Sequence, residues 1–281
     1  MINNNGHLIP SSQATLAVSN RGLSYGDALF ETIKTLNGKI LFWEDHYFRL
    51  MASMRILRME IPMEFTPEFL ESQILELLHH NYSNSNSFRV KLTVFRKQGG
   101  FYTPDTNDIE YFITTESLDA DIYLLNSSGY TIELFKDFYV TLGLLSTLKT
   151  NNKVLNVLGS VYAKENQYDN CLLLNTNKSI VEALNGNLFL VKDNVIKTPP
   201  LTDGCLKGVM RKQVIEILKK LPDFECLEES ISPFELQKAD ELFITNVIQG
   251  IQPITTFRKK SYSAKVSQII LAKLNMSVRL T

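Results

Sequence analysis

Asn37-Gly38 places a tight turn between two short apolar runs near the start of this 281-residue chain. Both central residues of a two-residue hairpin loop adopt positive φ, which Asn and Gly tolerate better than other residues. The flanking runs, 30–36 (FETIKTL) and 39–42 (KILF), are rich in residues typical of strands. The pattern therefore predicts an antiparallel hairpin, so any fold for this chain must include a β-sheet.

Helical and strand-like segments alternate along the rest of the chain, which predicts a mixed α and β fold. We expect helices over 45–56, 67–80, 154–166, 208–221 and 264–274. Further strands are expected over 88–95, 109–115, 130–135, 140–145, 171–174, 179–182, 187–191 and 241–245. In the first helix we expect Asp45 as the N-cap, with Phe48, Met51 and Ile56 on one face.

A polar stretch over 117–128 indicates a linker, which gives an N-terminal α/β domain over 1–116 and a C-terminal domain over 129–281. Lys plus Arg is 29 and Asp plus Glu is 30, a balance that argues against a general nucleic-acid binder. The N-terminus MINNNGHLIP lacks the pattern of a signal peptide, and no apolar run is long enough for a membrane helix.

Cysteine and histidine usage suggests a reducing compartment and no metal site. Cys171, Cys205 and Cys226 are odd in number and scattered, so we expect free thiols and a cytoplasmic location. No CxxC or HxxxH spacing indicates a metal ligand set. The pair His79-His80 is expected to be a solvated helix end.

Four features could carry chemistry. Lys149 follows a predicted strand, and a lysine at the end of a buried strand loses solvation, so that its pKa falls and its amine becomes a nucleophile. Val209 and Met210 begin a helix after a Pro-rich loop, where backbone N–H groups can bind a phosphate. Arg49 lies beside an apolar helix face and can reach inward to an anion. Glu182 ends a short strand, where a carboxylate can have a specific partner.

Each of these features taken alone is more often an ordinary structural one. A solvated loop lysine, a plain helix start, a snorkelling arginine and a solvated strand end would give the same patterns. Together they supply an amine, a phosphate cradle, a cation and a carboxylate. That is the set of groups which a phosphorylated pyridine aldehyde needs from a protein.

The sequence resembles the class IV (fold type IV) aminotransferase family, which includes branched-chain aminotransferases, D-amino acid aminotransferases and aminodeoxychorismate lyases. The resemblance extends from Asn5-Gly6 to about Ile254. It is carried by six segments in the order of the family: NRGLSYGDALFETIK (20–34), DHYFRL (45–50), LKTNN (148–152), SIVEALNGNLFLV (179–191), TPPLTDGCLKGVMR (198–211) and ADELFITNVIQGIQPI (239–254). The fold implied is α+β or α/β, with two α/β domains, pyridoxal 5'-phosphate in the cleft between them, and a homodimer whose partner subunit borders the pocket.

The resemblance also implies roles for single residues. Lys149 matches the lysine that forms the Schiff base with the cofactor, and Lys153 is the nearby competitor. Lys149 is preferred because Lys-Thr-x-Asn resembles the usual lysine segment of the family. Glu182 matches the carboxylate that pairs with the pyridine nitrogen and keeps it protonated. Arg49 matches the arginine that binds the cofactor phosphate.

Two backbone segments and two side chains complete the implied site. The amides of Val209 and Met210 match the pair that cradles the phosphate. Asn246 and Val247 match a second loop on the phosphate side, although many relatives carry Thr at the position of Val247. The residues implied to line the substrate pocket are Tyr25 and Phe30.

The segment around Lys91 bears on the substrate. Branched-chain aminotransferases usually carry Tyr-x-Arg on this strand, whereas the chain reads Arg89-Val90-Lys91. Lys91, Arg96 and Gly99-Gly100 resemble aminodeoxychorismate lyases better, and Lys91 or Arg96 could pair with a substrate carboxylate. The same two side chains are equally typical of surface charges on an edge strand.

We therefore expect a 4-amino-4-deoxychorismate lyase that forms 4-aminobenzoate and pyruvate from a small-molecule amino substrate. A branched-chain or D-amino acid aminotransferase of class IV is the alternative, because the fold does not decide between transamination and elimination. A non-catalytic dimer that keeps the fold as a binding protein is a third hypothesis. No nucleic-acid or membrane partner is expected.

Overall fold

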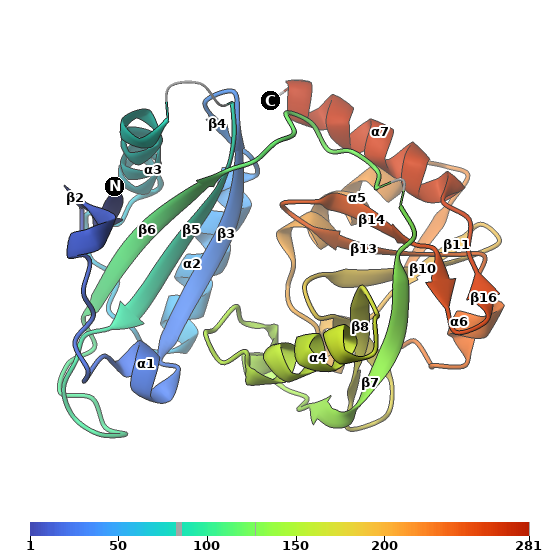
Figure 1. Cartoon of the computed structure of the whole chain (residues 1–281), viewed down its shortest axis with the longest axis horizontal. Helices are drawn as coiled ribbons and strands as arrows, with labels where there is room; N and C mark the ends of the chain where they lie inside the picture. The colour runs from blue at the N-terminus through green and yellow to red at the C-terminus, as the bar shows by residue number, and fades with distance from the viewer. Residues whose placement is uncertain (83–85, 127, 281) are drawn as a thin grey trace. The chain divides into compact units, whose positions relative to one another are not determined.

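The computed structural model describes residues 1–82, 86–126 and 128–280 (Figure 1). The chain divides into two compact units. Unit 1 comprises Met1–Asp121 and Lys149–Asn152, and unit 2 comprises Ile122–Leu148 and the chain from Lys153 onward. The change of unit after Asp121 falls within the segment 117–128. The short segment 149–152 belongs to unit 1, although the chain on both sides of it belongs to unit 2.

Unit 1 contains, within the described residues, a six-stranded antiparallel sheet in the order β2-β1-β6-β5-β3-β4. Its strands are β1 (Ile2–Asn4), β2 (His7–Ile9), β3 (Ala28–Leu36), β4 (Lys39–Ile40), β5 (Ser87–Arg96) and β6 (Ile109–Ser117). The hairpin predicted at Asn37-Gly38 is confirmed, with both residues at positive φ. Because β5 lies between β3 and β6, the alternative interpretation of Lys91 and Arg96 as surface charges on an edge strand is wrong.

The helices of unit 1 are α1 (Arg21–Tyr25), α2 (Trp43–Ile56) and α3 (Pro67–Asn81), with a 3₁₀ turn η1 (Ser11–Gln13). Phe42, at φ 55°, turns the chain into α2 directly after β4, so that Asp45 lies inside the first turn and is not the N-cap. The expected apolar face is also wrong, because Phe48 is 63% and Ile56 37% exposed. The face that α2 buries consists of His46, Leu50, Met51, Ser53 and Met54.

Unit 2 contains two five-stranded sheets among the described residues, in the orders β12-β11-β10-β13-β14 and β16-β15-β7-β8-β9. The strands are β7 (Thr131–Val140), β8 (Asn170–Asn175), β9 (Ile180–Ala183), β10 (Asn187–Lys192), β11 (Val195–Thr198), β12 (Glu225–Glu228), β13 (Glu241–Asn246), β14 (Gly250–Ile254), β15 (Thr256–Phe257) and β16 (Lys260–Ser261). One buried apolar cluster takes members from both sheets, among them Leu172 and Leu242. This cluster is therefore the core that joins the sheets.

The helices of unit 2 are α4 (Val154–Glu165), α5 (Val209–Leu218), α6 (Glu235–Lys238) and α7 (Lys265–Leu280), with 3₁₀ turns η2 (Leu144–Thr147) and η3 (Leu201–Asp203). The strand expected over 140–145 is wrong. Gly143, at φ 139°, takes a backbone conformation that favours glycine, and η2 follows it. Leu144 and Leu145 are exposed, so their apolar run is no buried strand.

None of the helices in the described part of the chain combines the length and apolarity that a membrane crossing requires. The same residues contain no group of three or more His, Cys, Asp and Glu side chains that could hold a metal ion.

Candidate active site

Lys149 is attached to unit 1 by backbone pairing with the start of β3. Its carbonyl oxygen accepts a hydrogen bond from the N–H of Phe30 at 2.9 Å, and the N–H of Asn151 donates to the carbonyl of Ala28 at 3.0 Å. Leu29 and Thr150 form an antiparallel bridge. The segment therefore continues the sheet beyond β3, a role that neither its sequence nor the strand predicted before it indicated.

The ring of Phe30 has two ammonium groups beside it. The Nζ atom of Lys149 lies 4.3 Å from the ring centroid, and the Nζ atom of Lys91 lies 5.1 Å from it. Thr93 is the direct cross-strand partner of Phe30, and Lys91 is the partner of Thr32. Successive side chains alternate across a strand, so Phe30, Thr32 and Lys91 share one face of the sheet. The structure thus brings together three of the residues predicted for the site: Phe30, Lys91 and Lys149.

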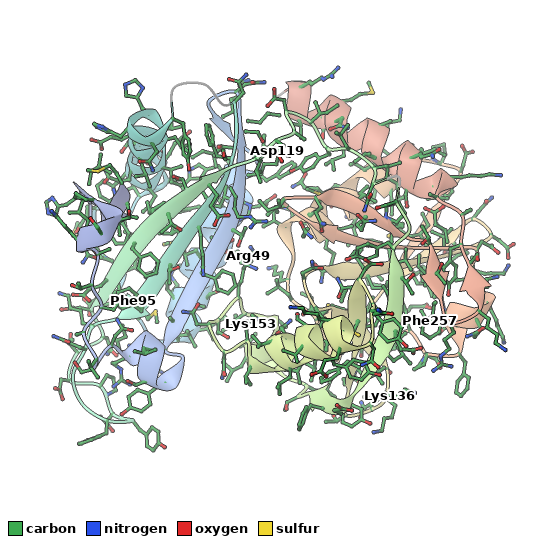
Figure 2. All side chains as sticks on the ribbon, in the orientation of Figure 1. Arg49, Phe95, Asp119, Lys136, Lys153 and Phe257 are labelled. Atoms are coloured by element: carbon green, nitrogen blue, oxygen red, sulfur yellow. The ribbon has the colours of Figure 1, made fainter. Side chains whose placement is uncertain are left out.

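Arg49 lies on α2 (Figure 2) and its partner is a carboxylate of the sheet. Its Nε donates to Oε1 of Glu31 at 2.8 Å, and its Nη2 donates to Oε2 of the same residue. The Nδ1 atom of His46 lies 2.7 Å from Oε2 of Glu31. Glu31 is 2% and His46 0% exposed. A buried arginine–carboxylate–histidine cluster therefore surrounds the predicted phosphate-binding residue.

Burial and charge act in opposite directions on Glu31. Burial raises the pKa of its carboxyl, but the neighbouring Arg49 guanidinium and the hydrogen bonds from His46 and Arg49 outweigh burial and lower that pKa to about 2. Burial lowers the pKa of His46 against the attraction of Glu31. Because an ionised carboxylate only accepts hydrogen bonds, the neutral His46 carries its proton on Nδ1.

Arg96 is committed to structural contacts. All five of its N–H donors are used: Nε and Nη2 donate to Asp27, Nη1 donates to the carbonyl of Arg58 and to Oδ1 of Asn107, and Nη2 also donates to the carbonyl of Leu57. Its side chain is only 7% exposed. A substrate carboxylate would have to displace one of these partners, so the substrate role predicted for Arg96 gains no support from the geometry.

Asp27 links Arg96 to the loop that carries Gly99-Gly100. Its Oδ2 atom also accepts from Nε of Arg21 at 3.0 Å, and Nη1 of Arg21 donates to the carbonyls of Gly99 and Phe101. Tyr25, predicted to line the pocket, ends the short helix that begins at Arg21 and is 41% exposed. Its ring lies 5.0 Å from the guanidinium carbon of Arg21.

In unit 2, Glu182 is held by the segment that precedes α5. Its Oε2 atom accepts from the backbone N–H of Leu206 at 2.9 Å and from Nδ2 of Asn187 at 3.2 Å. Nδ2 of Asn187 also donates to the carbonyl of Leu206 at 2.9 Å, and Asn187 is 4% exposed. Asn187 therefore fixes the carboxylate and the loop to each other.

Val209 and Met210 are the first two residues of α5, as expected, and both are buried. The N-cap residue is Gly208, and no side chain caps this helix end. A Cβ atom at Gly208 would lie 2.0 Å from Oδ1 of Asn187, so only glycine fits there without a shift. The first N–H groups of an α-helix have no acceptor within the helix and can bind an anion.

Asn246, the last residue of β13, and Val247 lie at the turn that joins β13 to β14. Oδ1 of Asn246 accepts from the N–H groups of Ile248 and Gln249 at 3.1 and 2.9 Å, so its side chain shapes the turn. The carbonyl of Val247 accepts from the hydroxyl of buried Tyr123 at 2.8 Å. Both predicted residues thus lie in an ordered turn of unit 2.

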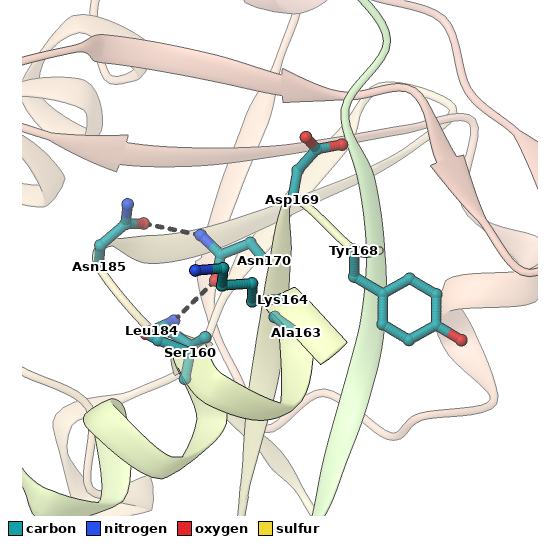
Figure 3. Close-up of a pocket in the computed structure, with 8 residues that line it drawn as sticks. All are labelled: Ser160, Ala163, Lys164, Tyr168, Asp169, Asn170, Leu184 and Asn185. Atoms are coloured by element: carbon teal, nitrogen blue, oxygen red, sulfur yellow. Dashed lines mark hydrogen bonds between the residues drawn. The ribbon is translucent and has the colours of Figure 1, made fainter. Parts of the chain in front are cut away.

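Unit 2 also has a small pocket of about 260 Å³ beside α4 (Figure 3). Its lining includes Ser160, Lys164, Asp169 and Asn185, together with Asn170, whose Nδ2 donates to Oδ1 of Asn185 at 2.8 Å. None of the residues predicted for the site lines it.

Sequence reasoning missed Glu31, His46 and Asn187. A usable signal existed for the first two: Glu31 has the same strand parity as Leu29 and Ile33, and a carboxylate at a core-facing position needs a buried partner. His46 and Arg49 are three residues apart on one helix and can both reach it. Asn187 gave no comparable signal, because the segment that it contacts lies 19 residues away.

The chain matches the family described as amino-transferase class IV over residues 28–257. It belongs to this family. This match confirms the expected family, fold type and class IV enzyme. Enzymes of the family use pyridoxal 5'-phosphate, which confirms the expected cofactor.

Individual relatives differ in their reaction. The chain is 30% identical over 253 residues to a putative branched-chain-amino-acid aminotransferase of Methanocaldococcus jannaschii, in a match that covers 89% of this chain and 85% of that one. It is 26% identical over 248 residues to an aminodeoxychorismate lyase of Vibrio harveyi, with 86% and 88% covered. Among solved structures, the holo form of the branched-chain amino acid aminotransferase from Thermobaculum terrenum has a TM-score of 0.85 at 22% identity, with 99% and 92% covered. That likeness shows the shared fold.

Proposed function

We propose that this class IV enzyme binds pyridoxal 5'-phosphate through Lys149 and Arg49 of unit 1 and through Glu182 and the α5 and Asn246-Val247 segments of unit 2. The residues present fit such a group. No side chain caps the N-terminus of α5, and its N-cap residue, Gly208, has no side chain that could cover the backbone N–H groups. The carboxylate of Glu182 is held in place by hydrogen bonds from a backbone N–H and a side-chain amide, and a carboxylate is a suitable partner for a pyridine nitrogen.

When bound, the cofactor supplies an electron sink for a carbanion on the substrate. The chain's own residues would hold the cofactor and transfer protons to and from the substrate. Glu182 would pair with the pyridine nitrogen, and the amides of Val209 and Met210 would bind the phosphate. Nζ of Lys149 would hold the cofactor covalently, and its amine would serve as the base for the proton on the substrate carbon that bears the amino group.

A visible absorption spectrum with added cofactor tests the lysine. We expect wild-type protein to show a band at roughly 410–430 nm that borohydride converts to a stable reduced adduct, and Lys149→Ala to lack it. Lys153→Ala is the matched control and is expected to keep the band, since Lys153 is the N-cap residue of α4 in unit 2. A band that survives in Lys149→Ala but not in Lys153→Ala would transfer the role to Lys153.

For the reaction we propose elimination from 4-amino-4-deoxychorismate, giving 4-aminobenzoate and pyruvate. The observation that supports this choice is the second ammonium group, Lys91, 5.1 Å from the Phe30 ring that Lys149 also contacts. A substrate that has a ring and more than one carboxylate suits an aromatic side chain beside a cation, whereas a branched-chain amino acid offers that cation only its α-carboxylate. Arg96 is not carried into the proposal.

The balance of the reaction needs no co-reactant. A proton leaves the ring carbon that bears the amino group, and the adjacent C–O bond breaks, so that the ring becomes aromatic. The oxygen leaves with the electron pair of that bond as the enolate of pyruvate, which takes up one proton on carbon and becomes pyruvate. We expect pyruvate release in the absence of any 2-oxo acid, with Lys91→Met lowering kcat/KM by about 10-fold or more because a charged contact to the substrate is lost.

Transamination is the second candidate, favoured by the 30% identity to the putative branched-chain enzyme. It requires an amino acceptor, so the two reactions separate in one assay. Activity that depends strictly on 2-oxoglutarate, with no pyruvate from aminodeoxychorismate, would refute the lyase. The homodimer and the cytoplasmic location stay predictions.

A further inference from the structure

Glu31 is a carboxylate in an unfavourable place. Along β3 its side chain has the same parity as Leu29 and Ile33, and its direct partner on β5 is Leu92. These three neighbours are at most 1% exposed. Isolated burial of a carboxylate in such surroundings is costly, and the cost is offset only by specific partners.

Both partners come from α2. Arg49 meets the carboxylate with Nε and Nη2, which form one side of the planar guanidinium, and His46 donates to Oε2 from Nδ1. This bidentate contact fixes the plane of the guanidinium and orients the corner with Nη1 away from Glu31. A guanidinium with one fixed side has little rotational freedom to lose when its other corner binds an anion.

His46 has no other task that its contacts reveal. Its ring is fully buried, and Nε2 has no hydrogen-bond partner among the residues described. A buried ring nitrogen without a partner destabilises the fold. The hydrogen bond at Nδ1 is therefore the function that the contacts of this side chain indicate.

We propose that Glu31, oriented by His46, is a positioning residue that holds the Arg49 guanidinium ready for a phosphate group. This inference rests on the proposed function, because it takes Arg49 as the ligand of the cofactor phosphate. Glu31 acts through Arg49 and touches neither cofactor nor substrate.

The test compares pyridoxal 5'-phosphate with pyridoxal, which lacks the phosphate, by calorimetric titration of purified protein. The ratio of the two dissociation constants measures what the phosphate contributes. We expect Glu31→Gln to reduce this ratio by about 10-fold or more and Arg49→Met to reduce it at least as much, while both retain similar affinity for pyridoxal.

Asp27→Asn is the matched control, since it weakens the other arginine–carboxylate pairs described in unit 1, those of Asp27 with Arg96 and Arg21. It is expected to lower the melting temperature and leave the ratio unchanged. A full ratio in Glu31→Gln together with a reduced one in Arg49→Met would overturn the inference and leave the proposed function standing. Wild-type protein that shows no preference for the phosphorylated ligand would overturn both.

The orientation by His46 has its own contrast. An asparagine amide can stand in for the Nδ1 donor of His46, whereas leucine cannot. We expect His46→Leu to reduce the ratio and His46→Asn to restore most of it. Equal ratios in the two variants would refute the part assigned to His46.

Discussion

At the scale of single residues, two arginines of unit 1 have different roles. Arg49 and Arg96 both lie beside carboxylates, and Arg96 donates all five of its N–H groups to protein atoms. Glu31 engages Arg49 through Nε and Nη2. Sequence patterns proposed a ligand role for both arginines, because a pattern gives the residue type and not the atoms that occupy its donors.

The Glu31 carboxyl predicts a dependence of stability on pH. Its pKa is lowered from 4.5 to about 2, so the folded protein binds fewer protons at this site than the unfolded chain between these values. The contribution is present above pH 4.5 and is lost as the pH falls towards 2.

Urea unfolding of wild type and Glu31→Gln from pH 7 to pH 3 measures this contribution. The glutamine has no carboxyl to protonate, so we expect the difference in unfolding free energy to be constant above about pH 5 and to shrink on acidification. A difference that stays constant down to pH 3 would show that the carboxyl is not ionised at a lowered pKa.

At the scale of elements, the start of α5 depends on a residue of β10. Gly208 has φ −70°, which any residue adopts, so glycine is needed there only because a Cβ atom would meet Oδ1 of Asn187. Asn187 cannot turn aside without breaking its hydrogen bonds to Glu182 and to the carbonyl of Leu206.

This arrangement predicts non-additive stability changes. We expect Gly208→Ala to destabilise the protein by about 1–3 kcal/mol through overpacking. The same change should cost much less in an Asn187→Ala background, which thermal or urea unfolding of the double-mutant cycle measures. Gly129→Ala is the control, since its nearest atom would be 3.8 Å away. Additive changes would mean that Asn187 is not what requires the glycine.

Sequence patterns predicted where helices, strands and turns lie better than they predicted which helix face is buried. The hairpin at Asn37-Gly38 and the helix start at Val209 follow from local residue preferences, and both are confirmed. The predicted buried face of α2 was wrong because Phe48 and Ile56 lie outside the stripe formed by Leu50, Met51 and Met54, and apolar residue type alone does not say which stripe is buried. The strand predicted over 140–145 was wrong because Gly143 adopts a positive φ, a backbone conformation that a hydrophobic pattern does not reveal.

At the scale of the whole molecule, the family resemblance supplied what periodicity could not. Lys149 and Glu182 lie 33 positions apart and in different units, and no local pattern connects them. Six segments in a fixed order identified the family before any geometry was known, and the match over residues 28–257 confirms it. The contacts of Asn187 with Leu206 and of Arg96 with Asp27 came only from the structure, because they join residues 19 and 69 positions apart.

The grouping of residues 149–152 with unit 1 has a consequence for dividing the chain. A fragment that ends at Asp121 would lack the segment that pairs with Ala28 and Phe30, and would leave that edge of β3 with unpaired N–H and C=O groups. The complementary fragment would carry Lys149 without the strand that anchors it. Neither fragment is therefore a self-contained module, because Lys149 follows Asp121 in the sequence but belongs to unit 1 in the fold.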